Sequence, residues 1–84
     1  MRRIGENESF LDFYNNEKAK SSPRIIASIL NAVYTTQYNQ KDIELDVEKF
    51  GCEFKKENET LFLELQDLPI FKLYNKMIQK KSNG

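Results

Sequence analysis

The chain has 84 residues, which is enough for one domain and too few for two. Its 13 lysines and arginines balance its 13 aspartates and glutamates, so no overall field draws it to nucleic acid or to an anionic membrane. With no histidine and one cysteine, it has no Ser-His-Asp or Cys-His arrangement, no intrachain disulfide and no zinc site of cysteine and histidine. We therefore expect a protein that is not an enzyme and that holds no cofactor and no metal.

Charge is distributed unevenly along this neutral chain. Residues 42–67 hold nine acidic and three basic side chains, a net charge of −6. Residues 68–84 hold four lysines and no acidic residue, a net charge of +4. The acidic middle and the basic end either face each other within the fold or present two surfaces of opposite sign.

Two features of the sequence indicate the cellular compartment of the protein. No apolar run approaches the roughly 18–20 residues needed to cross a bilayer, and the first residues lack the apolar stretch of a signal peptide. A single cysteine also suits a reducing compartment. We expect a cytoplasmic or otherwise intracellular protein with one domain over residues 1–84, frayed at residues 1–8 and 82–84.

The first two predicted elements are helices. Ser9 can cap a helix that carries Asp12 in its first turn and ends near residues 18–20. Ser22 suits the N-cap of a second helix, with Pro23 at its first position. This second helix has no charge over residues 25–40, and its large apolar residues recur at helical spacing: Ile25, Ile26, Ile29, Leu30, Val33 and Tyr34. We expect it to be the central helix of the fold.

Residues 42–54 fit two patterns. Ile43, Leu45 and Val47 alternate with acidic residues, which is typical of a strand with one exposed face. The alternation continues one residue out of phase, a shift that a β-bulge or a turn near Gly51 would absorb. The alternative is a short helix over residues 42–50 that stops at Gly51. The strand is favoured because Leu45 fits only that pattern. It would bury Cys52 and protect its thiol from labelling.

The rest of the chain predicts a hairpin followed by a helix. Residues 55–59 form a polar turn, and leucines alternate over residues 61–65 as in a second strand. Pro69 then begins the last helix. We therefore expect an α+β fold in which the helices pack on one face of a two- or three-stranded antiparallel sheet, in the order α-α-β-β-α. The alternative is a winged helix, with residues 42–50 as its third helix and the hairpin as its wing.

An acidic stripe would line the exposed face of the first strand. Its members are Asp42, Glu44, Asp46 and Glu48. Their spacing resembles that of a calcium loop, but Val47 stands where such a loop needs glycine. We interpret the stripe as a solvated face, and alternatively as a surface that meets a basic partner.

The last helix combines an apolar arc with a basic row. The arc covers about 160° and contains Ile70, Phe71, Leu73, Tyr74, Met77 and Ile78. The row on the opposite side contains Lys72, Lys76 and Lys80. We expect the middle of the arc to close the core. Phe71 and Ile78 would form an exposed edge that anchors a partner beside the lysines.

These features favour a non-catalytic protein–protein interaction module, acting as a small regulatory or inhibitory protein or as an interaction domain of a larger chain. The partner would be another protein or a second copy, whose acidic middle would meet the basic end of the first. The alternative is a nucleic-acid-binding winged-helix regulator. Nucleic acid is disfavoured because its recognition segment, residues 42–50, would carry four acids and one lysine. A membrane is disfavoured because the chain is neutral overall.

Overall fold

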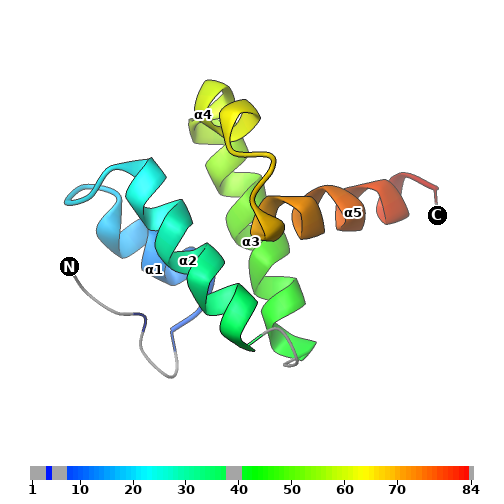
Figure 1. Cartoon of the computed structure of the whole chain (residues 1–84), viewed down its shortest axis with the longest axis horizontal. Coiled ribbons are helices and arrows are strands. Elements are labelled where there is room, and N and C mark those ends of the chain that lie inside the picture. The colour runs from blue at the N-terminus through cyan, green and yellow to red at the C-terminus, as the bar shows by residue number, and fades with distance from the viewer. Residues whose placement is uncertain (1–3, 5–7, 38–40, 84) are drawn as a thin grey trace.

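A computed structural model of the chain describes residue 4 and residues 8–37 and 41–83, with the side chains at 37, 41–45 and 81–83 outside the description. Five helices follow one another in these ranges (Figure 1): α1 Phe10–Glu17, α2 Pro23–Gln37, α3 Lys41–Glu57, α4 Glu59–Glu64 and α5 Pro69–Asn83. No strand occurs in the described ranges, and the helices pack into one small all-helical domain.

The predicted α+β fold is therefore wrong. Residues 42–54 belong to α3, and residues 61–65 belong to α4 and the turn that follows it. The reason is visible in the buried face of α3, where Val47, Phe50 and Phe54 recur at steps of three and four residues and are fully buried. The winged-helix alternative is also wrong. Its third helix exists but continues through Gly51, and the described residues contain no hairpin to serve as the wing.

The predicted starts of three helices are confirmed. Ser9 caps α1, because its Oγ accepts a hydrogen bond from the backbone N–H of Asp12 at 3.1 Å. The Oγ of Ser22 lies 3.4 Å from the backbone nitrogen of Ile25 at the start of α2. The prolines stand at the first position of α2 and of α5.

The core is centred on α3 rather than on α2. Helix α3 contacts all four of the other helices. The prediction that α2 is central is wrong, because α2 buries one stripe and leaves Ile25 41% exposed. Leu30 on that stripe is fully buried, whereas Ile29 is only half-buried.

Aromatic rings fill the space around α3. Each ring lies against at least one other, with centroids 5.1–5.9 Å apart, in edge-on, tilted and stacked arrangements. The rings come from α1, α3, α4 and α5: Tyr14, Phe50, Phe54, Phe62, Phe71 and Tyr74. One aromatic cluster therefore connects four of the helices.

The predicted frayed ends fall largely outside the description, which omits residues 1–3, 5–7 and 84. Ile4 packs against the core, and Glu8 accepts a hydrogen bond from Asn16 at 3.1 Å. Residues 82 and 83 belong to the last turn of α5.

Candidate functional site

Helix α5, the predicted partner-binding element, is anchored at its beginning by α2. The Oδ1 of Asn31 on α2 accepts a hydrogen bond from the backbone N–H of Ile70 at 3.0 Å. This N–H is one of the first groups of α5, which have no acceptor within the helix. Because Pro69 has no N–H to satisfy, a single side chain from another helix completes much of the cap. The start of α5 is therefore fixed relative to α2.

The first two turns of α5 belong to the core. Ile70 and Phe71 are fully buried, and Tyr74 is 4% exposed. The ring of Tyr74 lies directly on Gly51 of α3, where an added Cβ would stand 2.3 Å from Tyr74 Cδ1. Helices α3 and α5 thus cross at very close range. This crossing sets the direction in which the rest of α5 leaves the domain.

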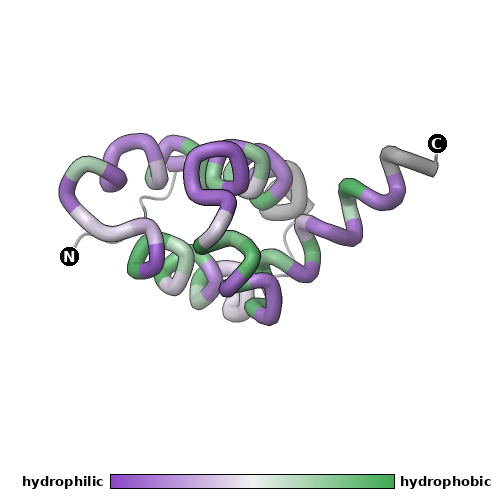
Figure 2. The backbone as a smooth tube through the Cα atoms, turned by 90° about the horizontal axis from the view of Figure 1, so that it is seen from above, coloured by the Kyte–Doolittle hydropathy of each residue, from purple (hydrophilic) through white to green (hydrophobic). Residues whose placement is uncertain are grey.

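Beyond Tyr74, α5 leaves the body of the molecule. Figures 1 and 2 show its C-terminal half projecting past the other helices. Among the described side chains after Tyr74, none is fully buried. Met77 and Ile78 are half-buried although both are apolar, and Met77 does not pack against the buried core. Met77 is therefore the apolar residue of this extension that the domain's own core does not cover.

One rim of α5 combines apolar and basic side chains. Leu73, which packs partly against the core, and Met77 lie four residues apart and so share one side of the helix. At 100° per residue, Lys76 and Lys80 fall within roughly 100° of them. We call these four residues the α5 edge. Both lysines are exposed, and neither forms an ion pair among the described residues, nor does Lys72.

The predicted Phe71–Ile78 edge is not the exposed one. Phe71 has no exposed surface, since its ring packs against Phe50 and Phe54 of α3 and Phe62 of α4. Ile78 follows on the same side and packs partly against the core. The side of α5 that the sequence assigned to a partner therefore packs against α3 and α4 instead.

The predicted acidic stripe does not form, because residues 42–48 are helical. In a helix, positions 42 and 46 recur on one side, and positions 44 and 48 lie roughly 160° away. The side chains of Asp42 and Glu44 lie outside the described residues. Asp46 and Glu48 are half-buried, and each already takes part in an interaction.

Cys52 is exposed, so the expected burial of this residue is wrong. A helix turns residue 52 about 200° from Phe50, away from the core, whereas a strand would keep both on one face. Tyr74 Oη lies 3.7 Å from Cys52 Sγ and donates a hydrogen bond to it. Burial of the ring, followed by this hydrogen bond, raises the pKa of Tyr74 to about 12.

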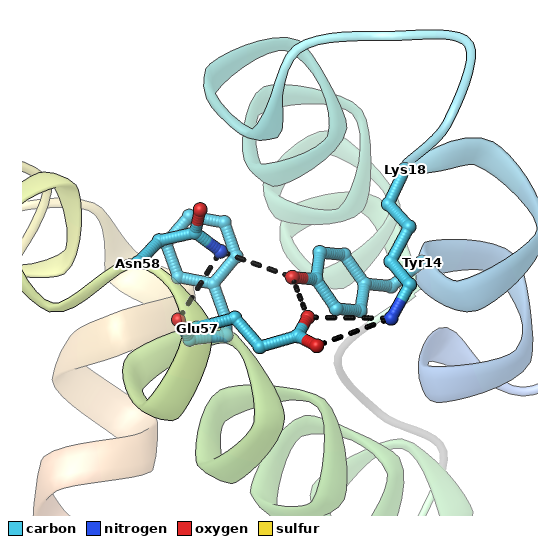
Figure 3. A network of polar contacts seen from close by, with 5 residues as sticks. Tyr14, Lys18, Glu57 and Asn58 are labelled. Carbon is cyan, nitrogen blue, oxygen red and sulfur yellow. Dashed lines mark hydrogen bonds and ion pairs between the residues drawn. The ribbon is translucent and has the colours of Figure 1, made fainter.

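A second polar cluster, the Tyr14 network, joins α1 to the end of α3 (Figure 3). The Oη of Tyr14 donates to Glu57 Oε1 and accepts from Asn58 Nδ2 at 3.0 Å. Lys18 Nζ lies 3.2 Å from Glu57 Oε2. No local sequence motif indicates this cluster, because its members are about forty residues apart.

The electrostatics of the Tyr14 network indicate a structural role. Burial, with the hydrogen bond to Glu57, raises the pKa of Tyr14 to about 12. Hydrogen bonds from Tyr14 and Lys18 hold the pKa of Glu57 below its usual value. At neutral pH the phenol is therefore protonated and the carboxylate ionised. Neither group is poised near pH 7 for general acid–base work.

The two buried tyrosines predict a loss of stability at alkaline pH. Each has a folded-state pKa near 12, above the value of about 10 expected in the unfolded chain. The contribution of each tyrosine to the free energy of unfolding is therefore complete below pH 10 and is lost as the pH rises through 12. This contribution is about 2 kcal/mol per ring. Urea midpoints between pH 8 and 12 would show the decline. Tyr14→Phe should remove about half of it, and an unchanged decline would contradict the assignment to Tyr14.

The described side chains include no group of three or more His, Cys, Asp or Glu residues placed to hold a metal ion. No helix in the described ranges combines the length with the apolar composition that a bilayer crossing requires. No protein-family model, curated protein or solved structure matches the chain.

Proposed function

We propose that this chain is a non-catalytic protein-interaction module that binds its partner through the α5 edge. It would act as a small regulatory or inhibitory protein or as an interaction domain of a larger chain. One observation carries the proposal. Helix α5 continues to Asn83, nine residues past Tyr74, its last fully buried residue, and this extension carries the half-buried Met77 beside the exposed Lys76 and Lys80.

The physical reason is that such a helix end gains little from its own domain. Isolated helices shorter than about 12–15 residues are marginal in water, and most helical stability comes from packing an apolar face. Leu73 and Met77 leave part of their apolar surface in water. Covering that surface would stabilise the complex by about 25 cal/mol per Å².

The chemistry of the α5 edge favours a protein partner with an apolar groove and acidic rims. An amphipathic helix binds in such a groove by inserting apolar side chains at positions i and i+4, and Leu73 and Met77 would supply them. Methionine is among the residue types enriched at interfaces. The lysines would pair with carboxylates and speed encounter with an acidic surface. An intracellular setting belongs to the same proposal, because an exposed free thiol such as Cys52 suits a reducing compartment.

Site-specific photo-crosslinking in the source cell tests this proposal. A photoreactive residue at position 77 should trap a protein that the same residue at position 49, an exposed site on α3, does not trap. The trapped protein is identified by mass spectrometry, purified and titrated against the chain. Reversal of Lys76 and Lys80 to glutamate should weaken its binding by about tenfold or more.

A matched control reverses Lys20 and Lys49, two exposed lysines outside α5. These changes alter the net charge equally and should leave the affinity close to that of the wild type. Equal crosslinking at positions 77 and 49, or equal affinity of the two charge-reversed variants, would contradict the proposed docking surface.

A further inference from the structure

We infer that residues 59–68 form a lid that opens as one unit while the other four helices stay packed. The lid consists of α4 and the turn that leads to α5. Figure 1 shows α4 at the C-terminal end of α3, the described helix with which it packs most closely. The lid is separate from the α5 edge, and different variants test the two.

Both ends of the lid are fixed to other parts of the domain. Before the lid, Asn58 Nδ2 donates hydrogen bonds to Tyr14 Oη at 3.0 Å and to the carbonyl oxygen of Phe54 at 3.3 Å. After the lid, the backbone N–H of Ile70 donates to Asn31 Oδ1 at 3.0 Å. Because these bonds hold the two ends on α1, α3 and α2, the segment between them can move without releasing its neighbours.

The lid itself is held closed by few contacts. Helix α4 has six residues, well below the length at which isolated helices are stable, and its N-cap residue makes no side-chain capping bond. Phe62 is the one buried side chain of α4, whereas Leu63 is 59% exposed. Leu61 and Leu65 are only half-buried. The packing of one ring is therefore the main apolar contact that closes the lid.

One ion pair connects the lid to α2. Arg24 Nη2 lies 2.9 Å from Glu64 Oε2, and both side chains are more than half exposed. An exposed pair of this kind contributes little to stability and is screened by salt. It therefore adds little to the contacts of Phe62.

The ring of Phe62 covers aromatic surface on α5. Its centroid lies 5.1 Å from that of Phe71 and 5.6 Å from that of Tyr74, edge-on in both cases. Lys55 Nζ lies 5.6 Å from the same centroid. Opening of the lid would uncover the rings of Phe71 and Tyr74, while Tyr74 would still lie against Gly51 of α3. The domain would then have a second state with exposed aromatic surface and four packed helices.

Native-state amide hydrogen exchange, followed by NMR at neutral pH, tests the lid. The backbone amides at positions 62, 65 and 68 donate hydrogen bonds that the opening would break. After correction for intrinsic rates, these three amides should share one opening equilibrium. They should exchange about 100-fold or more faster than the amide of Phe54 on α3. Urea should also accelerate them less, because the opening exposes less surface than global unfolding does.

Two variants and a matched control separate the lid from the rest of the domain. Val47 is fully buried on α3, so Val47→Ala should speed exchange at Phe54 by about tenfold. The same change should leave the three lid amides within about twofold of the wild type. Phe62→Leu should speed the lid amides by about tenfold. Leu63→Ala, at the exposed position of α4, is its control and should change them by less than about twofold.

Two outcomes would overturn the inference: lid amides that are as well protected as that of Phe54, or an equal acceleration of both by Val47→Ala. Either result would mean that the lid opens only when the whole domain unfolds. The proposed function would stand or fall separately, because its test is the loss of partner binding on reversal of Lys76 and Lys80.

Discussion

Replacing Phe71 with alanine is expected to lower the free energy of unfolding by about 3–5 kcal/mol, the usual cost of removing a buried phenylalanine ring. The ring has no exposed surface. Its centroid lies 5.1 Å from the ring centroids of Phe54 and Phe62 and 5.9 Å from that of Phe50. Its loss would open a cavity where α3, α4 and α5 meet. Since whole domains are stable by only about 5–15 kcal/mol, the variant should be largely unfolded at modest urea concentration.

Urea titration followed by far-UV circular dichroism measures this effect. Met77→Ala provides the matched control, because it shortens an apolar side chain on the same helix outside the buried core. That variant should lose less than about 1 kcal/mol. If Phe71→Ala were as stable as Met77→Ala, the side of α5 that faces the core would be misassigned.

Replacing Gly51 with alanine should also destabilise the domain, although alanine favours a helix over glycine by about 1 kcal/mol. The added Cβ would stand 2.3 Å from Tyr74 Cδ1, closer than any ordinary contact. The ring is buried and cannot swing into solvent. Overpacking of this kind typically costs about 1–3 kcal/mol, and a clash this short at a helix crossing belongs at or above the upper end.

A double-mutant cycle separates the clash from the helix preference. In a Tyr74→Ala background the obstruction is gone, so Gly51→Ala should be neutral or stabilising by up to about 1 kcal/mol. In the wild-type background the same change should be destabilising. A stabilising effect in both backgrounds would mean that the α3–α5 crossing is wider than the structure shows.

The local signals in the sequence predicted the helix starts well. Ser9 and Ser22 supply side-chain acceptors for free N–H groups, and the prolines fit the first helical turn. These effects operate within four residues and need no knowledge of the fold. The predictions that depended on them are the ones that the structure confirms.

The prediction for the middle of the chain was wrong because its apolar residues fit both the two-residue period of a strand and the 3.6-residue period of a helix. Ile43 and Val47 are four residues apart, so they share a face in a strand and in a helix alike. Leu45 decided the prediction in favour of the strand. The change of phase between Val47 and Phe50, explained as a β-bulge, was the three-residue step of a helix. A two-stranded hairpin would also have been marginal by itself in water.

Other features depend on contacts between distant residues. The sequence predicts a turn near Gly51, or a helix stop there in the alternative, but Gly51 lies inside α3 and makes room for Tyr74, 23 residues later. The hydrogen bond from Ile70 to Asn31 likewise crosses 39 residues. The lysines and the apolar arc of α5 were visible in the sequence. Which rim of the arc stays exposed was not, because the α3–α5 crossing decides it.

Site-resolved amide hydrogen exchange along α5 tests most directly the claim that its first turns are core and its C-terminal half is a docking surface. In dilute protein, the amide of Tyr74 should exchange only through near-global unfolding, and that of Lys80 should exchange orders of magnitude faster. Adding a purified partner should slow exchange at Lys80 and leave exchange at Tyr74 unchanged. Equally slow exchange at both positions in the dilute chain would contradict the account, because the whole of α5 would then belong to the core.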